Sequence, residues 1–337
     1  MKKWQKISVR VVLVLAIILL LYASLFLFDF SVANITWGVT FSKSFAEKLN
    51  LDWRETYTAV LDDLKVQNVR INTYWDDIER QEGSYTWSDY DWQLQEAQKR
   101  GVQVVLIIGR RTARWPECHD PSWIKNLTEE QKRGKVLTIL KKEVEHFKKY
   151  DNIVMWQVEN EPLLSLFGEC TGISREFLQR EVSIVKTLDQ RPIMVTDSGE
   201  LSTWLHAGGA GEDTLGTTLY KRVWNPYMGH VSYFLPPAYY TARAWFLDTL
   251  YGTHVIISEL QGEPWGAQQK ELTNLTLDEQ FTSFDEQRFQ ETIAFARKTG
   301  FNEIYLWGAE WWYWLKTTQH DPVFWNDAKK LFTPTAP

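Results

Sequence analysis

The sequence predicts an α/β protein folded as a (β/α)8 TIM barrel and preceded by one N-terminal transmembrane helix. From about residue 35 onward, short β-branched runs alternate with amphipathic helical stretches, a pattern typical of βα units around a parallel sheet. We count eight such runs, and eight units favour a closed barrel over an open sheet. A long apolar segment near the start of the chain predicts the additional helix.

The eight runs and the helical stretches between them can be placed along the chain. The predicted strands are Ile35 to Thr40, Val69 to Thr73, Val102 to Ile108, Ile153 to Val158, Ile193 to Thr196, Leu215 to Tyr220, Val255 to Ser258 and Glu303 to Trp307. The predicted helices are Trp53 to Lys65, Tyr90 to Arg100, Glu129 to Tyr150, Arg175 to Leu188 and Phe281 to Lys298. Gly101 and Gly300 stand where a left-handed residue would end a helix before the next strand. The Gly-rich stretch from Gly199 to Asp213 predicts a short or irregular fifth helix.

The apolar run from Val11 to Phe28 is long enough to cross a bilayer, which takes about 20 residues. It exceeds the roughly 7 to 15 apolar residues of a cleavable signal, and Ser31-Val32-Ala33 offers only a middling cleavage site. We therefore favour an uncleaved signal-anchor over a cleaved signal peptide. Four basic residues precede the run: Lys2, Lys3, Lys6 and Arg10. They predict an N-terminus in the cytoplasm and the remainder outside the membrane.

Charge and composition exclude one class of partner. Removing the four N-terminal cations from the formal net charge of −6 leaves −10 on the rest of the chain. No basic stripe follows residue 30, so nucleic acid is not expected as a ligand. Eighteen tryptophans and fourteen tyrosines suit both a hydrophobic core and the apolar faces of sugars.

Polar groups that end the predicted strands are the candidates for chemistry, because catalytic groups of such barrels lie at the C-terminal ends of the strands. The fourth run is followed by Glu159-Asn160-Glu161-Pro162, and Pro162 stops strand pairing because it has no N–H group to donate. The seventh run is followed directly by Glu259.

Asn160-Glu161-Pro162, after a hydrophobic strand that contains Trp156, resembles the acid/base motif of the clan A glycoside hydrolases. The resemblance extends over essentially the whole chain from Trp37 onward. It implies a retaining O-glycosidase that cleaves β-linked glycosides, with Glu161 as the general acid/base and Glu259 as the nucleophile. Residues 1–30 would then form the basic tip and signal-anchor, and residues 31–337 the catalytic domain, outside the cell membrane to which a single helix attaches it.

The resemblance also implies substrate-binding residues. Trp307 would form the floor of the sugar site, Arg70 would lie near the nucleophile, and Tyr220 would donate a hydrogen bond to it. Asn160 would bind a substrate hydroxyl. The chain resembles cellulase-like enzymes of family five, but it lacks their histidines beside Tyr220 and after the third strand, where Thr217-Thr218-Leu219 and Gly109-Arg110-Arg111 stand instead. These departures put that narrower assignment in doubt and leave the clan assignment intact.

Retaining hydrolysis explains the need for two carboxyl groups about 5 to 5.5 Å apart, one to attack the anomeric carbon and one to move the proton. It needs no cofactor or metal ion. The expected partner is an oligo- or polysaccharide. Two other functions fit the same sequence: a non-catalytic carbohydrate-binding barrel, and a transglycosylase that uses the same carboxylate pair.

Several residues have structural as well as functional interpretations. Glu159 is expected in a structural salt bridge, and Glu263 competes with Glu259 as nucleophile. Trp265 is a candidate for substrate binding. Like Trp311, Trp312 and Trp314, it is also a candidate for packing. Arg110, Arg111 and Arg114 predict a solvated loop with local ion pairs. Cys118 and Cys170 would both lie on active-face loops, where a disulfide and two free thiols both fit the sequence.

Overall fold

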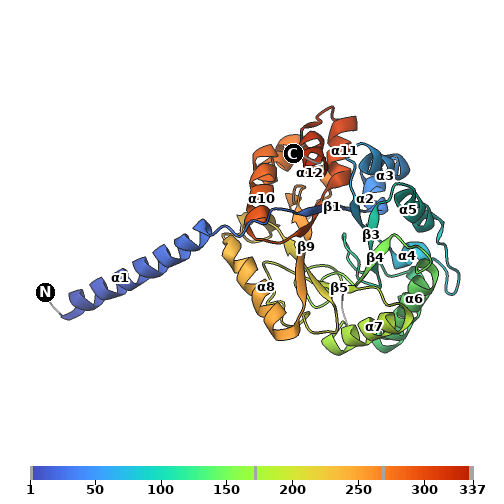
Figure 1. The fold of residues 1–337 in the computed structure, drawn as a ribbon, viewed down its shortest axis with the longest axis horizontal. Helices are drawn as coiled ribbons and strands as arrows, with labels where there is room; N and C mark the ends of the chain where they lie inside the picture. Colours follow the sequence, from blue (N-terminus) through green and yellow to red (C-terminus); the bar gives the residue numbers. More distant parts are fainter. Residues whose placement is uncertain (1–2, 171–172, 268–269, 334–337) are drawn as a thin grey trace.

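The computed structural model describes residues 3–170, 173–267 and 270–333, and its centre is a closed barrel of eight parallel strands. Hydrogen bonds join the strands in the order β1-β10-β9-β6-β5-β4-β3-β2. Each predicted strand is present, which confirms the (β/α)8 fold (Figure 1). The barrel strands are β1 (Thr36–Phe41), β2 (Asn68–Asn72), β3 (Gln103–Ile108), β4 (Ile153–Val158), β5 (Ile193–Asp197), β6 (Thr214–Leu219), β9 (His254–Gln261) and β10 (Glu303–Trp307).

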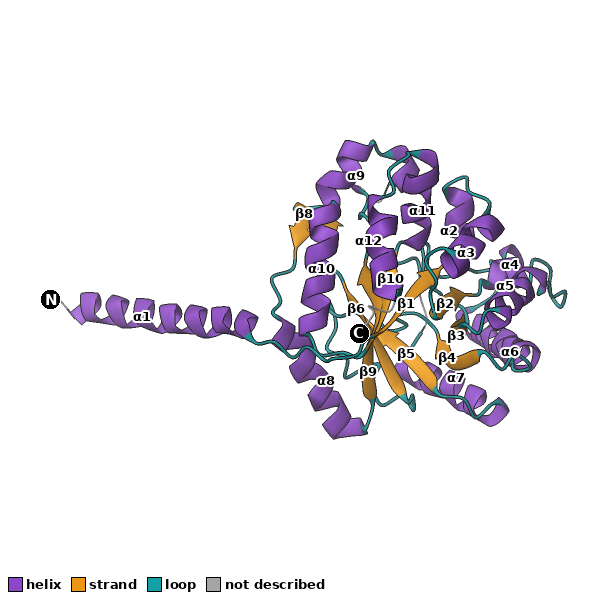
Figure 2. Ribbon diagram, turned by 45° about the horizontal axis from the view of Figure 1, so that its top comes forward, coloured by secondary structure: helices purple, strands orange, loops and turns teal. Residues whose placement is uncertain are grey.

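Helices surround the barrel (Figure 2). They are α2 (Lys43–Lys48), α3 (Trp53–Asp62), α4 (Trp75–Ile78), α5 (Ser88–Lys99), α6 (Glu129–Phe147), α7 (Arg175–Leu188), α8 (Pro237–Tyr251), α9 (Leu277–Ser283), α10 (Glu286–Lys298), α11 (Ala309–Thr318) and α12 (Val323–Phe332). Short 3-10 turns are η2 (Ser122–Ile124) and η4 (Leu272–Asn274). Four of the five predicted helices are confirmed as single helices, with small differences at their ends.

One helix prediction needs correction. The stretch predicted as one helix from Phe281 to Lys298 is two helices, because Phe284 is extended and the Asp285 side chain caps α10 by accepting from the Arg288 N–H at 2.9 Å. The stretch from Gly199 to Asp213, for which a short or irregular helix was expected, forms turns, in agreement with the irregular alternative. The hairpin of β7 (Arg222–Asn225) and β8 (Gly229–Ser232), which precedes α8, is absent from the prediction.

The core has three parts. The largest lies between the strands and the helices, and a smaller cluster of Val105, Met194, Ile256 and Tyr305 fills the barrel interior. A third cluster consists of Ile107, Ala113 and Trp307. A Cβ atom on Gly38 would lie 2.6 Å from the Tyr305 ring, so glycine at that position leaves room for the ring. Parallel strands buried on both faces explain why the strand runs are almost continuously apolar.

The N-terminal helix α1 (Lys3–Ser24) and the 3-10 turn η1 (Leu25–Leu27) extend away from the barrel (Figure 1). Within the described residues, this is the one helix long and apolar enough to cross a membrane by length and composition, with a mean hydropathy of 2.7 over Arg10–Leu27. The Phe30 amide donates to the Lys298 carbonyl at 3.1 Å, where the chain joins the barrel.

Candidate active site

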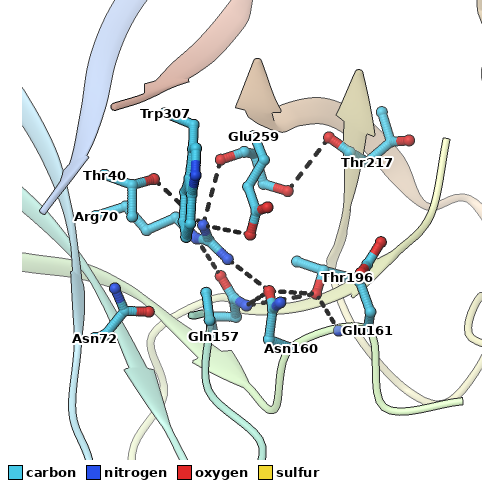
Figure 3. Close-up of polar contacts among 12 residues, drawn as sticks. Thr40, Arg70, Asn72, Gln157, Asn160, Glu161, Thr196, Thr217, Glu259 and Trp307 are labelled. Carbon is cyan, nitrogen blue, oxygen red and sulfur yellow. Dashed lines mark hydrogen bonds and ion pairs between the residues drawn. The ribbon is translucent and has the colours of Figure 1, made fainter. Parts of the chain in front are cut away.

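Glu259, Arg70 and Tyr220 meet at the C-terminal end of the barrel, as the sequence analysis expected (Figure 3 shows the first two). The Arg70 guanidinium lies 2.9 Å from Glu259 Oε1, and the Tyr220 hydroxyl donates to Oε2 at 3.2 Å. Arg70 is fully buried and Glu259 is 5% exposed. The Glu259 carboxylate is therefore fixed from two sides and faces a positive charge in a site shielded from water, where the attraction between opposite charges is stronger than in bulk water.

A β-bulge turns Glu259 toward the barrel centre. In β9 the pairing with β6 passes from Thr217–Ile257 to Thr218–Glu259, so that Ser258 is an extra residue. Ile257 and Leu260 both belong to the outer core beneath the helices. Regular alternation from Ile257 would have pointed Glu259 outward as well. The extra residue reverses that direction, as bulges beside active sites commonly do.

Arg70 is itself held by groups from other strands. Its Nε donates to Gln157 Oε1 at 2.6 Å and its Nη2 to Asn160 Oδ1 at 2.7 Å, and Thr40 Oγ1 lies 3.3 Å from Nη1 (Figure 3). Gln157, inside β4, went unnoticed in the sequence because it interrupts an apolar strand without ending it. These contacts tie β1, β2, β4 and β9 together at one guanidinium.

Glu161 follows β4 on a constrained backbone. Its φ is +43° and that of Glu159 is +61°, a left-handed conformation that costs a non-glycine residue about 1–3 kcal/mol and is concentrated at functional sites. The Glu161 amide donates to Thr196 Oγ1, from β5, at 2.8 Å. The backbone of Glu161 is thus fixed by the end of β4, by the hydrogen bond to Thr196 and by Pro162, which follows it in the chain.

The surroundings of Glu161 favour its protonated form. Burial raises the pKa of its carboxyl group well above the ordinary value, and the charges of Glu259 and Glu117 raise it further. Arg111 acts in the opposite direction but does not compensate. Glu161 can therefore hold a proton near neutral pH and release it to a substrate, while Glu259 lies beside a cation.

Glu117 is a third carboxyl group at the centre that the sequence analysis missed. Its Oε2 lies 3.3 Å from Asn160 Nδ2 and 3.8 Å from Arg111 Nε. Burial, followed by the charge of Glu259, raises the pKa of Glu117 to about 8. It stands beside Cys118, which forms a disulfide with Cys170 and so joins the loops after β3 and β4. That disulfide, which the sequence left open, is a signal that could have pointed to Glu117, because Cys118 is its neighbour in the chain.

Trp307 lies beside an ion-pair cluster. Its Nε1 donates to Glu263 at 2.8 Å, and the Arg114 guanidinium stacks 3.9 Å from its ring centroid. Arg114 also pairs with Glu263 and, at 3.3 Å, with Glu310. Glu263 is thus held by the Arg114 guanidinium and by the Trp307 indole. Burial raises the pKa of Glu310 to about 7.

The arginine-rich loop after β3 is not solvated, contrary to the prediction. Arg110 is buried and pairs with Asp120 at 2.6 Å, while Arg111 is buried and donates to the carbonyls of Leu164 and Phe167 at 2.9 Å each. The expectation of local ion pairs is confirmed for Arg110, which pairs with Asp120, and for Arg111, which lies 3.8 Å from Glu117, whereas the partners of Arg114 are distant in the sequence. The expected exposure is wrong because these side chains hold the loops of the active face together.

Glu159 has the structural role that was expected, but its partners are backbone amides. The N–H groups of Arg110 and Arg111 donate to it at 2.8 and 2.5 Å. A Cβ atom on Gly109, whose φ is +115°, would lie 2.4 Å from the Glu159 carboxylate. Glycine at this position is therefore required for Glu159 to reach the amides.

The candidate tryptophans divide into two groups. Trp265 is half-buried, with its ring centroid 5.6 Å from that of Tyr220 and 5.5 Å from that of Phe167, so it stands at the rim of the site. Trp311 and Trp312 are fully buried, and Trp311 packs 4.7 Å from Phe324. Trp314 is also buried. The last three tryptophans pack the protein core.

The sequence matches no protein-family model and no curated protein. Solved structures do resemble the fold. A xylanase 10B from Thermotoga petrophila is 16% identical with a TM-score of 0.54, over 82% of each chain. An exo-β-1,4-mannosidase from an Opitutaceae bacterium is 13% identical with a TM-score of 0.54, over 83% of this chain and 53% of that one. A β-galactosidase from Halorubrum lacusprofundi has a TM-score of 0.60 at 12% identity, over 81% of this chain and 52% of that one.

These glycoside hydrolases and this chain share the (β/α)8 barrel fold. This agrees with the resemblance given by the Asn160-Glu161-Pro162 motif. The chain spans about half the length of the mannosidase and of the galactosidase. At such low identities the likeness concerns the barrel, so the reaction has to be argued from the residues of the site.

Proposed function

We propose that the protein is a retaining glycoside hydrolase that cleaves β-linked glycosides. The observation that carries the proposal is the contrast between the surroundings of two carboxyl groups, that of Glu161, which follows β4, and that of Glu259, near the end of β9. Glu259 is held by Arg70 at 2.9 Å and by the Tyr220 hydroxyl, whereas burial and neighbouring acids raise the pKa of Glu161. Two carboxyl groups in opposite environments suit the roles of nucleophile and acid.

In the first half of the reaction, Glu259 attacks the anomeric carbon while Glu161 gives its proton to the glycosidic oxygen. The bond to the leaving sugar breaks and a glycosyl ester forms on Glu259. In the second half, Glu161 removes a proton from a water molecule, whose oxygen attacks the same carbon and frees Glu259. Trp307 would support the sugar face. The Asn160 amide would donate to a sugar hydroxyl, a contact that strengthens as the transition state develops.

The proposal includes the location of the enzyme. Residues 1–30 would form an uncleaved signal-anchor, with the catalytic domain of residues 31–337 outside the cytoplasmic membrane. The apolar window at Arg10–Leu27 supports this placement. So does the positive charge that precedes it. The substrate class would then be an oligo- or polysaccharide of the cell envelope or one captured from outside.

The test is covalent trapping on the full chain in detergent. A panel of aryl β-glycosides first identifies a sugar that is turned over, and the matching 2-deoxy-2-fluoro aryl glycoside is then added. We expect inactivation with a mass increase of one fluoroglycosyl group, located on Glu259 by peptide mapping, and no labelling of Glu259→Gln. Turnover that survives in Glu259→Ala, or a label on Glu263, would show that the nucleophile is wrong. Glycan binding without turnover would instead indicate a binding protein, and products longer than the substrate would indicate a transglycosylase.

A further inference from the structure

Helix α8 carries an apolar face that the barrel does not cover. Its residues Trp245, Phe246, Leu250 and Tyr251 are 68%, 50%, 52% and 43% exposed, while Leu247 on the same helix is 1% exposed. At about 100° per residue, Trp245, Phe246 and Leu250 lie within one arc of the helix, while Tyr251 stands at its C-terminal end, beyond the buried Leu247. Large apolar side chains gathered in this way indicate a surface that contacts another apolar phase. We call these four residues the α8 face.

The α8 face continues onto neighbouring segments. Leu205, 38% exposed, lines the same shallow hollow as Phe246. Phe234, which precedes α8, is 76% exposed. The apolar surface therefore extends beyond one helix.

The α8 face adjoins the end of the apolar N-terminal helix. Helix α8 contacts η1, the last turn of the apolar window at Arg10–Leu27. The Tyr22 hydroxyl donates to the carbonyl of Phe234, just before α8 begins. Figures 1 and 2 both show α8 on the side of the barrel from which α1 leaves. If Arg10–Leu27 crosses the bilayer, α8 has to lie at the bilayer surface, because it touches the last residues of the span.

The chemistry of α8 suits that position. Tryptophan and tyrosine combine an apolar ring with a polar N–H or O–H group, and they concentrate at the membrane–water interface. The helix carries a single acidic residue, Asp248, so little negative charge opposes contact with anionic lipids. Its one arginine, Arg243, is engaged within the protein through the carbonyls of Gly199 and Ser202.

We propose that the α8 face rests in the headgroup region of the bilayer and sets the orientation of the barrel. Figure 1 shows the barrel roughly along its axis, and α1 extends sideways from it in that view, so the helix runs roughly perpendicular to the barrel axis. The open end of the barrel then faces along the membrane plane, which points to glycans that lie close to the bilayer as substrates. The inference rests on the membrane anchoring in the proposed function.

The test compares two labelled variants of the full chain in vesicles of phosphatidylethanolamine and phosphatidylglycerol. Thr249→Cys is on α8 and Thr138→Cys on α6, across the barrel. Both threonines are exposed, and each hydroxyl bonds a carbonyl four residues earlier in its helix. The native cysteines are joined in a disulfide, so a thiol-reactive fluorophore labels the new residue only. A nitroxide-bearing lipid and aqueous iodide serve as quenchers.

We expect the lipid nitroxide to quench the label at position 249 several-fold more than the label at 138, and iodide to show the reverse order. Adding Phe246→Glu and Leu250→Glu to the Thr249→Cys variant should reduce the lipid quenching. Equal lipid quenching at both positions in protein that floats with the vesicles would overturn the α8 proposal alone. Protein that fails to float would overturn the anchor itself. Protection from iodide that depends on protein concentration, without lipid quenching, would indicate a second copy on the α8 face.

Discussion

Glu161 is placed to act twice in the proposed reaction, first as acid and then as base. Replacing it by alanine should lower kcat on aryl β-glycosides by about 10²- to 10⁴-fold, the usual contribution of a positioned acid or base. Azide should restore turnover, because this anion needs no base to attack the glycosyl ester on Glu259. The measurement is steady-state rate with product analysis for the glycosyl azide.

The control for this prediction is Glu169→Ala, an exposed glutamate after β4, which should keep the wild-type rate. A Glu161→Ala enzyme that retains its rate without azide would exclude Glu161 as the acid/base.

Glu117 should influence the pH profile through Glu161. The active form needs a protonated Glu161, so activity falls as pH rises through its raised pKa. The charge of Glu117 is one of the causes of that increase. Because burial raises the pKa of Glu117 itself to about 8, Glu117 acquires this charge only as the pH becomes alkaline. Glu117→Gln removes the charge over that range, and the alkaline limb of kcat/KM should therefore move to lower pH. The control is Glu82→Gln, a change at an exposed glutamate, and its pH profile of kcat/KM should match that of the wild type. An unmoved limb in Glu117→Gln would show that Glu117 does not act on Glu161.

Glu161, Glu259, Arg70 and Tyr220 could be proposed as site residues from the sequence because each stands in or beside an apolar strand whose end is visible in the sequence. It could not place Glu117, whose position depends on how a loop folds against Arg111 and Asn160. The direction in which the Glu259 side chain points could not be predicted from the sequence either. Strand alternation from Ile257 alone would turn it toward the helices, and only the bulge at Ser258, visible in the pairing with both neighbouring strands, turns it inward.

At the scale of the structural elements, the Cys118–Cys170 disulfide holds the loops after β3 and β4 together. The two cysteines are 52 residues apart in the sequence, and the chain-entropy model gives about 4 kcal/mol for closing a loop of that size. Cys118→Ser with Cys170→Ser should therefore lower the unfolding midpoint in urea. It should also reduce activity, since the loop carries Glu117 and Arg114. The single Cys170→Ser variant should lose as much stability as the pair, and an unchanged midpoint would contradict the prediction.

Helix α6 contributes a buried acid whose charge state couples stability to pH. Glu143 Oε2 accepts from the Gly109 amide at 3.0 Å, and Oε1 lies 2.6 Å from the Thr73 hydroxyl. That hydroxyl also lies 2.6 Å from the Ile107 carbonyl, so it can donate there while a protonated Glu143 donates to it. Burial raises the pKa of Glu143 to about 8 from the ordinary 4.5.

The sign of the pH effect follows from the raised pKa. The contribution of Glu143 to stability is complete below pH 4.5 and is lost as pH rises through about 8. Glu143→Gln keeps one donor and one acceptor and cannot ionise. Its melting temperature should therefore fall less than that of the wild type as pH rises from 4.5 to about 8. Glu145→Gln, an exposed change on the same helix, should follow the wild type. Parallel curves for all three proteins would contradict the prediction.

The order and type of these elements could be predicted because a doubly buried strand and an amphipathic helix leave different periodicities in the sequence. Reliance on this periodicity also explains why the break between α9 and α10 was missed. Phe281, Phe284 and Phe289 continue an apolar pattern through the junction, while the interruption comes from one side chain, Asp285, that caps a new helix. The β7–β8 hairpin was missed because its strands are only half-buried and show no clear alternation.

At the scale of the whole molecule, the barrel and the apolar helix together determine where the proposed chemistry takes place. The barrel brings side chains from β2, β4, β6 and β9 to one end. The contacts of η1 with α8 and of Phe30 with Lys298 leave little free chain between the span and the barrel. A barrel tethered this closely would reach substrates near the membrane and would not act as a freely diffusing enzyme.

The anchor can be tested by placing a charge in the middle of the span. Leu19 lies near the centre of the window Arg10–Leu27, where an arginine costs about 2.5–3.5 kcal/mol on the insertion scale. Leu19→Arg should therefore shift protein from the carbonate-resistant membrane fraction to the soluble fraction. Leu19→Ala, which shortens the side chain without adding charge, should stay in the membrane. Because an uncleaved anchor keeps residues 1–30 in the mature protein, intact mass should give the full chain in both cases. A wild-type mass that lacks the residues before Asn34 would instead mean that the segment is a cleaved signal peptide.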